Sequence, residues 1–210
     1  MAVTLYFVRH GETDANVTDK IQGQTDIPLN ARGIAQAKLV SERLKGMHFD
    51  AIYSSPLSRA AATAQAIADG REIIFLPELM EWNLGEWQGK SLTEIKEKYP
   101  EEHKLYFRNS IYFRPSGGES RREFRDRAEL VLDTIAKNHD GQTVLCVTHG
   151  GFMRAVLLTV MDMEKYPAAA RIDNTSISCF KTADAGKTWQ LITWNDHSHL
   201  NGDMVFSSGW

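Results

Sequence analysis

The sequence predicts a three-layer α/β/α fold with a mostly parallel central sheet. Short apolar, β-branched runs alternate with amphipathic stretches of helical period, as is typical of parallel sheets covered by helices. The length of 210 residues suits one domain with a single core. We therefore expect one domain over residues 1–210. Residues 82–118, rich in aromatic side chains, interrupt the alternation, and we interpret them as an excursion segment, or cap.

The apolar runs are the expected strands. Residues 3–8 form the first, and Arg9-His10 follows at its carboxyl end. Because open α/β sheets bind ligands beyond the carboxyl ends of their strands, residues in such places are candidates for a site. Further strands are expected at 51–54, 73–76, 143–148, 176–180 and 189–194.

Cap residues set where the expected helices begin and end. Asn30 suits the start of a helix over about 31–45, and Gly70 suits the end of an alanine-rich helix. Two capping boxes predict one short helix inside the excursion segment and one long helix after it. They are Ser91 with Glu94 and Ser120 with Glu123. A last helix is expected over about 152–162.

Composition narrows the function classes. The formal net charge of −3 argues against a nucleic-acid binder, and no apolar run is long enough for a membrane-spanning helix. Arg9 and His10 interrupt the apolar N-terminal run, so we do not expect a signal peptide. We expect a cytoplasmic location. Cys146 and Cys179 lie in apolar runs and are expected to be buried free thiols.

Two imidazoles and two guanidinium groups follow strands that should end at one edge of the sheet. They belong to His10, His149, Arg9 and Arg59. Imidazole is a nucleophile near neutral pH, and guanidinium binds phosphate oxygens with a fork of donors. A helix that starts after Gly150 would direct backbone N–H groups at an anion. Adjacent arginines would repel a cation, so we predict a phosphate site with no metal.

A phosphoryl-transfer site also needs a proton donor for the leaving oxygen. Glu81 is the candidate, because Leu79, Met80 and Trp82 around it would desolvate its carboxyl group and favour the protonated form. A solvated surface glutamate is the alternative interpretation.

Several ordered blocks surround these candidates. Arg9-His10-Gly11-Glu12-Thr13, followed by Asn16, resembles the signature of the histidine phosphatase superfamily, which also contains the cofactor-dependent phosphoglycerate mutases. Six blocks in order over residues 5–155 are far more specific than one Arg-His-Gly. The resemblance implies a phosphoglycerate mutase-like fold. The other blocks lie at 21–33, 54–59, 81–89, 117–120 and 147–151.

The resemblance also implies residue roles. His10 would attack phosphorus and carry a phosphohistidine, and Glu81 would protonate the leaving alkoxide and then activate water. Arg9, Arg59 and His149 would complete the catalytic set. No cofactor is implied. The residues expected to bind the phosphoryl group are Arg9, Asn16, Gln22, Gly23, Arg59, His149 and Gly150.

We predict a metal-independent phosphatase of small phosphorylated metabolites. The alternatives are a cofactor-dependent phosphoglycerate mutase and a non-catalytic phosphate-binding protein. Mutases of the family carry a longer insertion with an adjacent Arg-Arg pair before the Gly-Glu-Ser block. Here Arg108 and Arg114 stand apart, which favours hydrolysis.

The tail and the quaternary state stay open. The pair His199-Leu200 resembles a pair that lines the substrate pocket in some phosphatases of the family, and a metal role for His197 and His199 is disfavoured because they lack ligand partners at a recognised spacing. Exposed aromatic side chains in the excursion segment could form a homodimer face.

Overall fold

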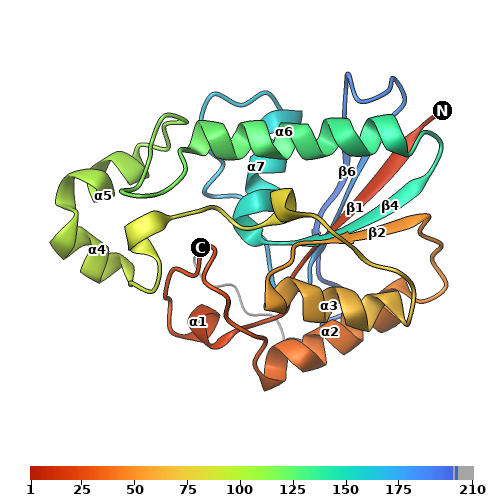
Figure 1. Cartoon of the computed structure of the whole chain (residues 1–210), viewed down its shortest axis with the longest axis horizontal. Coiled ribbons are helices and arrows are strands. Elements are labelled where there is room, and N and C mark those ends of the chain that lie inside the picture. Colours follow the sequence, from red (N-terminus) through yellow and green to blue (C-terminus); the bar gives the residue numbers. More distant parts are fainter. Residues whose placement is uncertain (201, 203–210) are drawn as a thin grey trace.

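The computed structural model describes residues 1–200 and 202, so most of the polar tail of the expected 1–210 domain lies outside the described residues. Within them, six strands form one sheet in the order β3-β2-β4-β1-β5-β6 (Figure 1). The four on one side are parallel, and β5 and β6 join as antiparallel neighbours. The strands are β1 Val3–Arg9, β2 Ala51–Ser54, β3 Ile74–Phe75, β4 Thr143–Thr148, β5 Ile177–Thr182 and β6 Gln190–Asp196.

Helices cover both faces of the sheet, which confirms the predicted three-layer α/β fold. Figure 1 shows α2 (Ala31–Leu44) and α3 (Ser58–Ala68) on one face and α6 (Arg121–Asn138) and α7 (Gly150–Val160) on the other. Side chains of the central strands alternate between the two layers, as the period of a strand requires. In β4, Val144 and Cys146 join the core under α6 and α7, whereas Leu145 and Val147 join the core against α2 and α3.

The excursion segment differs from its prediction. One helix was expected, but two are present, α4 (Leu92–Lys98) and α5 (Pro100–Phe107). Pro100 accounts for the division, because a proline ring disfavours the helical conformation for the residue before it, and Tyr99 has φ −132° and ψ 58°. Figure 1 places both helices beyond the end of the sheet.

Other elements also depart from expectation. The strand predicted over 73–76 is only Ile74–Phe75, at the sheet edge with both side chains exposed. The last predicted helix begins two residues earlier than expected, at Gly150. A short helix α1 (Asp14–Val17) and two 3-10 turns, η1 (Pro77–Leu79) and η2 (Gly85–Trp87), were not predicted. Within the described residues, no helix is long and apolar enough to cross a membrane.

Trp87 belongs to the main hydrophobic core and anchors other parts of the excursion segment around it. Its side chain is fully buried, and its indole nitrogen donates to Glu102 Oε2 at 2.8 Å. The ring lies 5.4 Å from the rings of both Tyr106 and Phe113. The prediction that both cysteines are buried free thiols is also confirmed.

Replacing Trp87 by alanine should therefore destabilise the protein. Loss of a buried tryptophan side chain costs about 3–5 kcal/mol, and the substitution also removes one of the hydrogen-bond donors to Glu102, which keeps those of Ser116. Urea unfolding would measure the free energy of unfolding, with Tyr112→Ala, at a position 70% exposed, as the control. Equal and small changes in the two variants would contradict the anchoring role of Trp87.

Candidate active site

Three parallel neighbours, β2, β4 and β1, end together and bring distant residues to one place. Arg9 pairs with Thr148, and Ser54 pairs with Val147, in the register of these strands. The next residues continue this alignment, since His10 N donates to the Thr148 carbonyl at 2.9 Å. The predicted convergence of His10, His149 and the Ser55 turn is thus present.

The hydrogen bonds of His10 determine which ring nitrogen is available. Nδ1 lies 2.7 Å from the Gly11 carbonyl, which can only accept, so Nδ1 carries the proton and Nε2 keeps its lone pair. Burial first, and then the charges of Arg59 and Arg9, lower the pKa of His10 well below its usual value of 6.5. The ring is therefore neutral at neutral pH.

His149 lies against His10, with ring centroids 5.1 Å apart. It is fully buried, and its Nε2 is 2.8 Å from Ser55 Oγ. Burial, followed by the Arg59 charge, also lowers the pKa of this imidazole well below 6.5. Its side chain is beside the nucleophile rather than among the residues that line the cavity.

Arg9 and Arg59 are buried cations held by backbone carbonyls. Arg59 Nη1 and Nη2 donate to Thr25 O at 2.8 Å and Gly23 O at 2.7 Å, and Arg9 Nη1 donates to Ile172 O at 2.6 Å. Burial lowers the pKa of each to about 10, so both stay charged at neutral pH. In the described part of the chain, neither forms an ion pair with a carboxylate, and the Nε atom of each has no partner. This arrangement suits an incoming anion.

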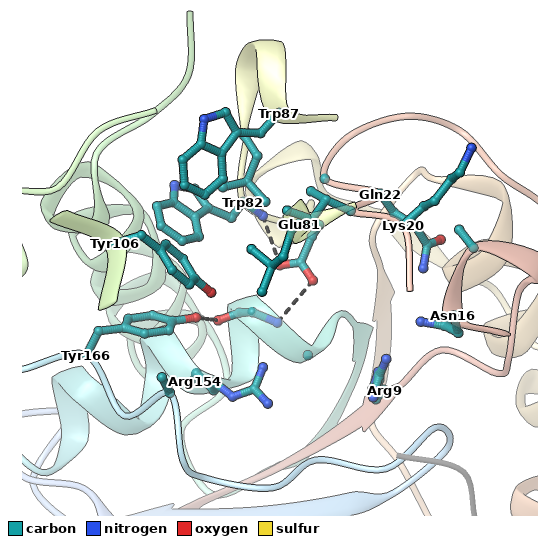
Figure 2. A pocket seen from close by; sticks show the side chains of 18 of the residues that line it. Arg9, Asn16, Lys20, Gln22, Glu81, Trp82, Trp87, Tyr106, Arg154 and Tyr166 are labelled. Atoms are coloured by element: carbon teal, nitrogen blue, oxygen red, sulfur yellow. Dashed lines mark hydrogen bonds between the residues drawn. The ribbon is translucent and has the colours of Figure 1, made fainter. Parts of the chain in front are cut away.

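Asn16 and Gln22 are oriented by Thr13. Asn16 Oδ1 accepts from Thr13 N at 3.1 Å and lies 3.0 Å from Thr13 Oγ1, which leaves the amide nitrogen as a donor into the cavity (Figure 2). Gln22 Oε1 is 3.0 Å from the same hydroxyl. Gly23 lines the cavity too, and its carbonyl holds Arg59.

Glu81 reaches the site from the other side. Its half-buried carboxylate accepts from Trp82 N at 2.9 Å and from Gly151 N at 3.0 Å (Figure 2). The Gly151 N–H at the start of α7, expected to face an anion, thus binds a protein carboxylate. A Cβ at Gly151 would lie 2.3 Å from Glu81 Oε1, so only glycine permits this approach.

All of the predicted site residues except His149 line one cavity of about 310 Å³. It also contains residues that sequence reasoning missed, among them Tyr106, Tyr166 and Arg154 (Figure 2). Arg154 had a usable signal, because it lies one helical turn after Gly150 and so on the same face of α7. The tail pair lies elsewhere: His199 Nε2 is 3.3 Å from Thr175 Oγ1, and Leu200 is buried outside the lining.

Comparison with known proteins agrees with this geometry. The family model of the histidine phosphatase superfamily (branch 1) matches residues 5–197. The chain belongs to this superfamily. A metal-independent phosphoserine phosphatase of Arabidopsis thaliana is 38% identical over 212 residues, which cover 98% of this chain and 87% of the relative. Phosphoglycerate mutase-like protein 4 of the same plant is 37% identical over 211 residues, 97% of this chain and 89% of that one.

Solved structures of the superfamily are similar throughout. A mutant phosphoserine phosphatase from Entamoeba histolytica, in complex with phosphoserine, has a TM-score of 0.86 and 34% identity, covering 95% of this chain and all of the other. A mycobacterial glucosyl-3-phosphoglycerate phosphatase has a TM-score of 0.83 and 29% identity, covering 93% and 99%. This histidine phosphatase is thus a phosphoric monoester hydrolase of small substrates, as the sequence predicted.

Gly151→Ala should displace Glu81 and lower activity without unfolding the protein. A misplacement of about 1 Å in a catalytic group can cost roughly 100-fold in rate, whereas alanine favours a helix over glycine. Steady-state kinetics and thermal unfolding would separate the two effects. Gly202→Ala is the control, because an added Cβ there would meet no atom of the described residues within 4 Å. Undiminished kcat/KM in Gly151→Ala would contradict the inferred close contact.

Titration of His10 should follow the charges around it. In the free enzyme the ring should titrate well below pH 6.5, and Arg59→Gln should move its midpoint upward because one of the charges that lower the pKa is removed. Ring resonances in an NMR titration would measure both midpoints. Arg122→Gln, an exposed arginine outside the cavity, should leave the midpoint unchanged. An unshifted midpoint in Arg59→Gln would show that this charge does not act on His10.

Proposed function

We propose that this histidine phosphatase hydrolyses small phosphorylated hydroxy acids by way of a phosphohistidine at Nε2 of His10. The observation that carries the proposal is the state of the His10 ring. Its Nδ1 is committed to the Gly11 carbonyl, and its lone pair on Nε2 stands beside two buried guanidinium groups that have no carboxylate partner in the described residues.

In the first step, His10 Nε2 attacks phosphorus. The N–P bond forms, the P–O bond of the ester breaks, and its electron pair leaves with the alkoxide, which Glu81 protonates as a carboxylic acid. Arg9 and Arg59 bind the phosphoryl oxygens, on which negative charge is spread in the transition state. Asn16 Nδ2 and His149 assist in the same task.

In the second step, water attacks phosphorus on the opposite side from His10. Glu81, now a carboxylate, takes a proton from this water, the N–P bond breaks, and the electron pair returns to His10 Nε2. Phosphate leaves, and both side chains are back in their starting states. The step needs a water molecule that reaches Glu81 once the alcohol has left.

The substrate class is supported by the size of the cavity and by the relatives. A volume of about 310 Å³ suits a small metabolite. Two structures of the Entamoeba enzyme hold phosphoserine and 3-phosphoglyceric acid. Both ligands are phosphate esters of a short hydroxy acid.

Transfer to a second substrate, as in a mutase, is less well supported. Arg108 and Arg114 in the excursion segment do not line the cavity, and Arg114 pairs instead with Glu123 at 2.6 Å. We therefore propose that water, and not a second substrate, accepts the phosphoryl group.

Organisation and location are part of the proposal. Residues 1–210 would form one domain with 82–118 as its cap. The buried free thiols Cys146 and Cys179 support a reducing, cytoplasmic location. A homodimer through the exposed aromatic residues Phe107 and Tyr112 stays a prediction.

Hydrolysis of p-nitrophenyl phosphate in EDTA tests the mechanism. Wild type should turn over without added metal, and His10→Ala should lose at least about 1000-fold in kcat. His48→Ala, at an exposed histidine far from the cavity, should keep full activity.

Acid quenching should destroy, and alkaline quenching should preserve, a labelled phosphoenzyme. Activity in His10→Ala would refute the nucleophile, and primed interconversion of phosphoglycerates with little phosphate release would indicate a mutase.

A further inference from the structure

Arg154 is a cation inside the cavity for which the two-step reaction gives no role. It lies on α7, its side chain is 9% exposed, and it lines the cavity. Its Nε donates to the Ala170 carbonyl at 2.9 Å, which fixes the direction of the guanidinium. Within the described residues, the two terminal nitrogens have no hydrogen-bond or ion-pair partner. Burying a charged guanidinium group without partners for its N–H donors costs free energy, and a bound anion would supply these partners.

The position of Arg154 shows which part of a ligand would bind to its guanidinium group. In Figure 2 its guanidinium lies between Arg9 and Tyr166, on the opposite side of the cavity from Glu81. The charge of Arg154 is, after burial, the next cause that lowers the pKa of Arg9, so the two cations are close enough to repel each other. An anion between or beside them removes this repulsion.

The phosphoryl group already has its own partners in Arg9 and Arg59. Glu81 marks the position of the leaving oxygen, and the alcohol must continue from there toward Tyr106 and Tyr166. That wall is fixed, because the Tyr166 hydroxyl donates to the Gly151 carbonyl at 3.1 Å. Arg154 therefore faces the alcohol part of the ester.

We infer that Arg154 binds a carboxylate on the alcohol part of the substrate and thereby determines selectivity for phosphorylated hydroxy acids. The inference rests on the proposed function, because it assigns the leaving group to the part of the cavity between Glu81, Tyr166 and Arg154. Guanidinium suits this role, since its planar fork binds both oxygens of a carboxylate.

Matched pairs of esters test the inference. Phosphoserine and phosphoethanolamine differ only in the carboxylate, and 3-phosphoglycerate and glycerol 3-phosphate differ chiefly in it. Wild type should prefer the carboxylated ester of each pair. Arg154→Gln should reduce this preference, as a ratio of kcat/KM values, by roughly 10- to 100-fold, the loss expected for a charged hydrogen bond. The change should appear mainly in KM, and Arg154→Lys should restore part of the preference.

Arg122→Gln is the control, because it removes an exposed arginine outside the cavity. Equal losses of kcat/KM on both members of each pair in Arg154→Gln, with an unchanged melting temperature, would mean that Arg154 acts on the phosphoryl group and would overturn the inference. An active wild type with no preference for the carboxylated esters would overturn it as well and leave the phosphatase mechanism intact. Absence of any phosphohistidine in wild type would instead contradict the proposed function, on which this inference rests.

Discussion

The burial of Arg9 and Arg59 beside His10 is the constraint on which the rest of this site depends. Removing a cation from water costs several kcal/mol, and in the described residues no carboxylate pairs with either group. Backbone carbonyls compensate instead, and they come from segments far apart in the sequence, at Gly23, Thr25 and Ile172. Each of these segments must therefore keep one conformation for the cations to remain buried.

Close contacts between irregular segments also fix the backbone on both sides of His10. The segment before β5 holds the end of β1 and the residue after it, since Thr175 N donates to Arg9 O at 3.0 Å and Asn174 Nδ2 donates to His10 O at 3.0 Å. On the other side, a Cβ at Gly33 would lie 2.1 Å from Glu12 O, so α2 can approach this turn only through a glycine. The nucleophile is thus fixed through its backbone, and its ring needs only the one bond to Gly11.

The parts of the site that the sequence could predict are those that depend on strand ends. The parallel register of β1 and β4 brings Arg9-His10 and Thr148-His149 together for any conformation of the loops. Locating the strands in the sequence was therefore enough to predict that these residues meet. Tyr166 reaches the cavity through the path of the chain after α7, for which local pattern holds no information, whereas Arg154 is within α7, one turn after Gly150, and could have been found from that spacing. The requirement for glycine at position 151 likewise depends on the distance to Glu81, which follows from tertiary structure alone.

The two ends of the cavity are built by different means, and this has a consequence for specificity. The phosphoryl end is fixed by the sheet and by buried cations. The alcohol end depends on the packing of the excursion segment against the rest of the chain, because Arg121 in α6 lies 4.6 Å from the ring of Tyr106, in the excursion segment, and 4.8 Å from the ring of Tyr166. These cation–π contacts, each worth up to about 2 kcal/mol when desolvated, join α5 to α6 without touching His10. A change in the excursion segment can therefore alter which alcohol is accepted while the chemistry at phosphorus stays the same.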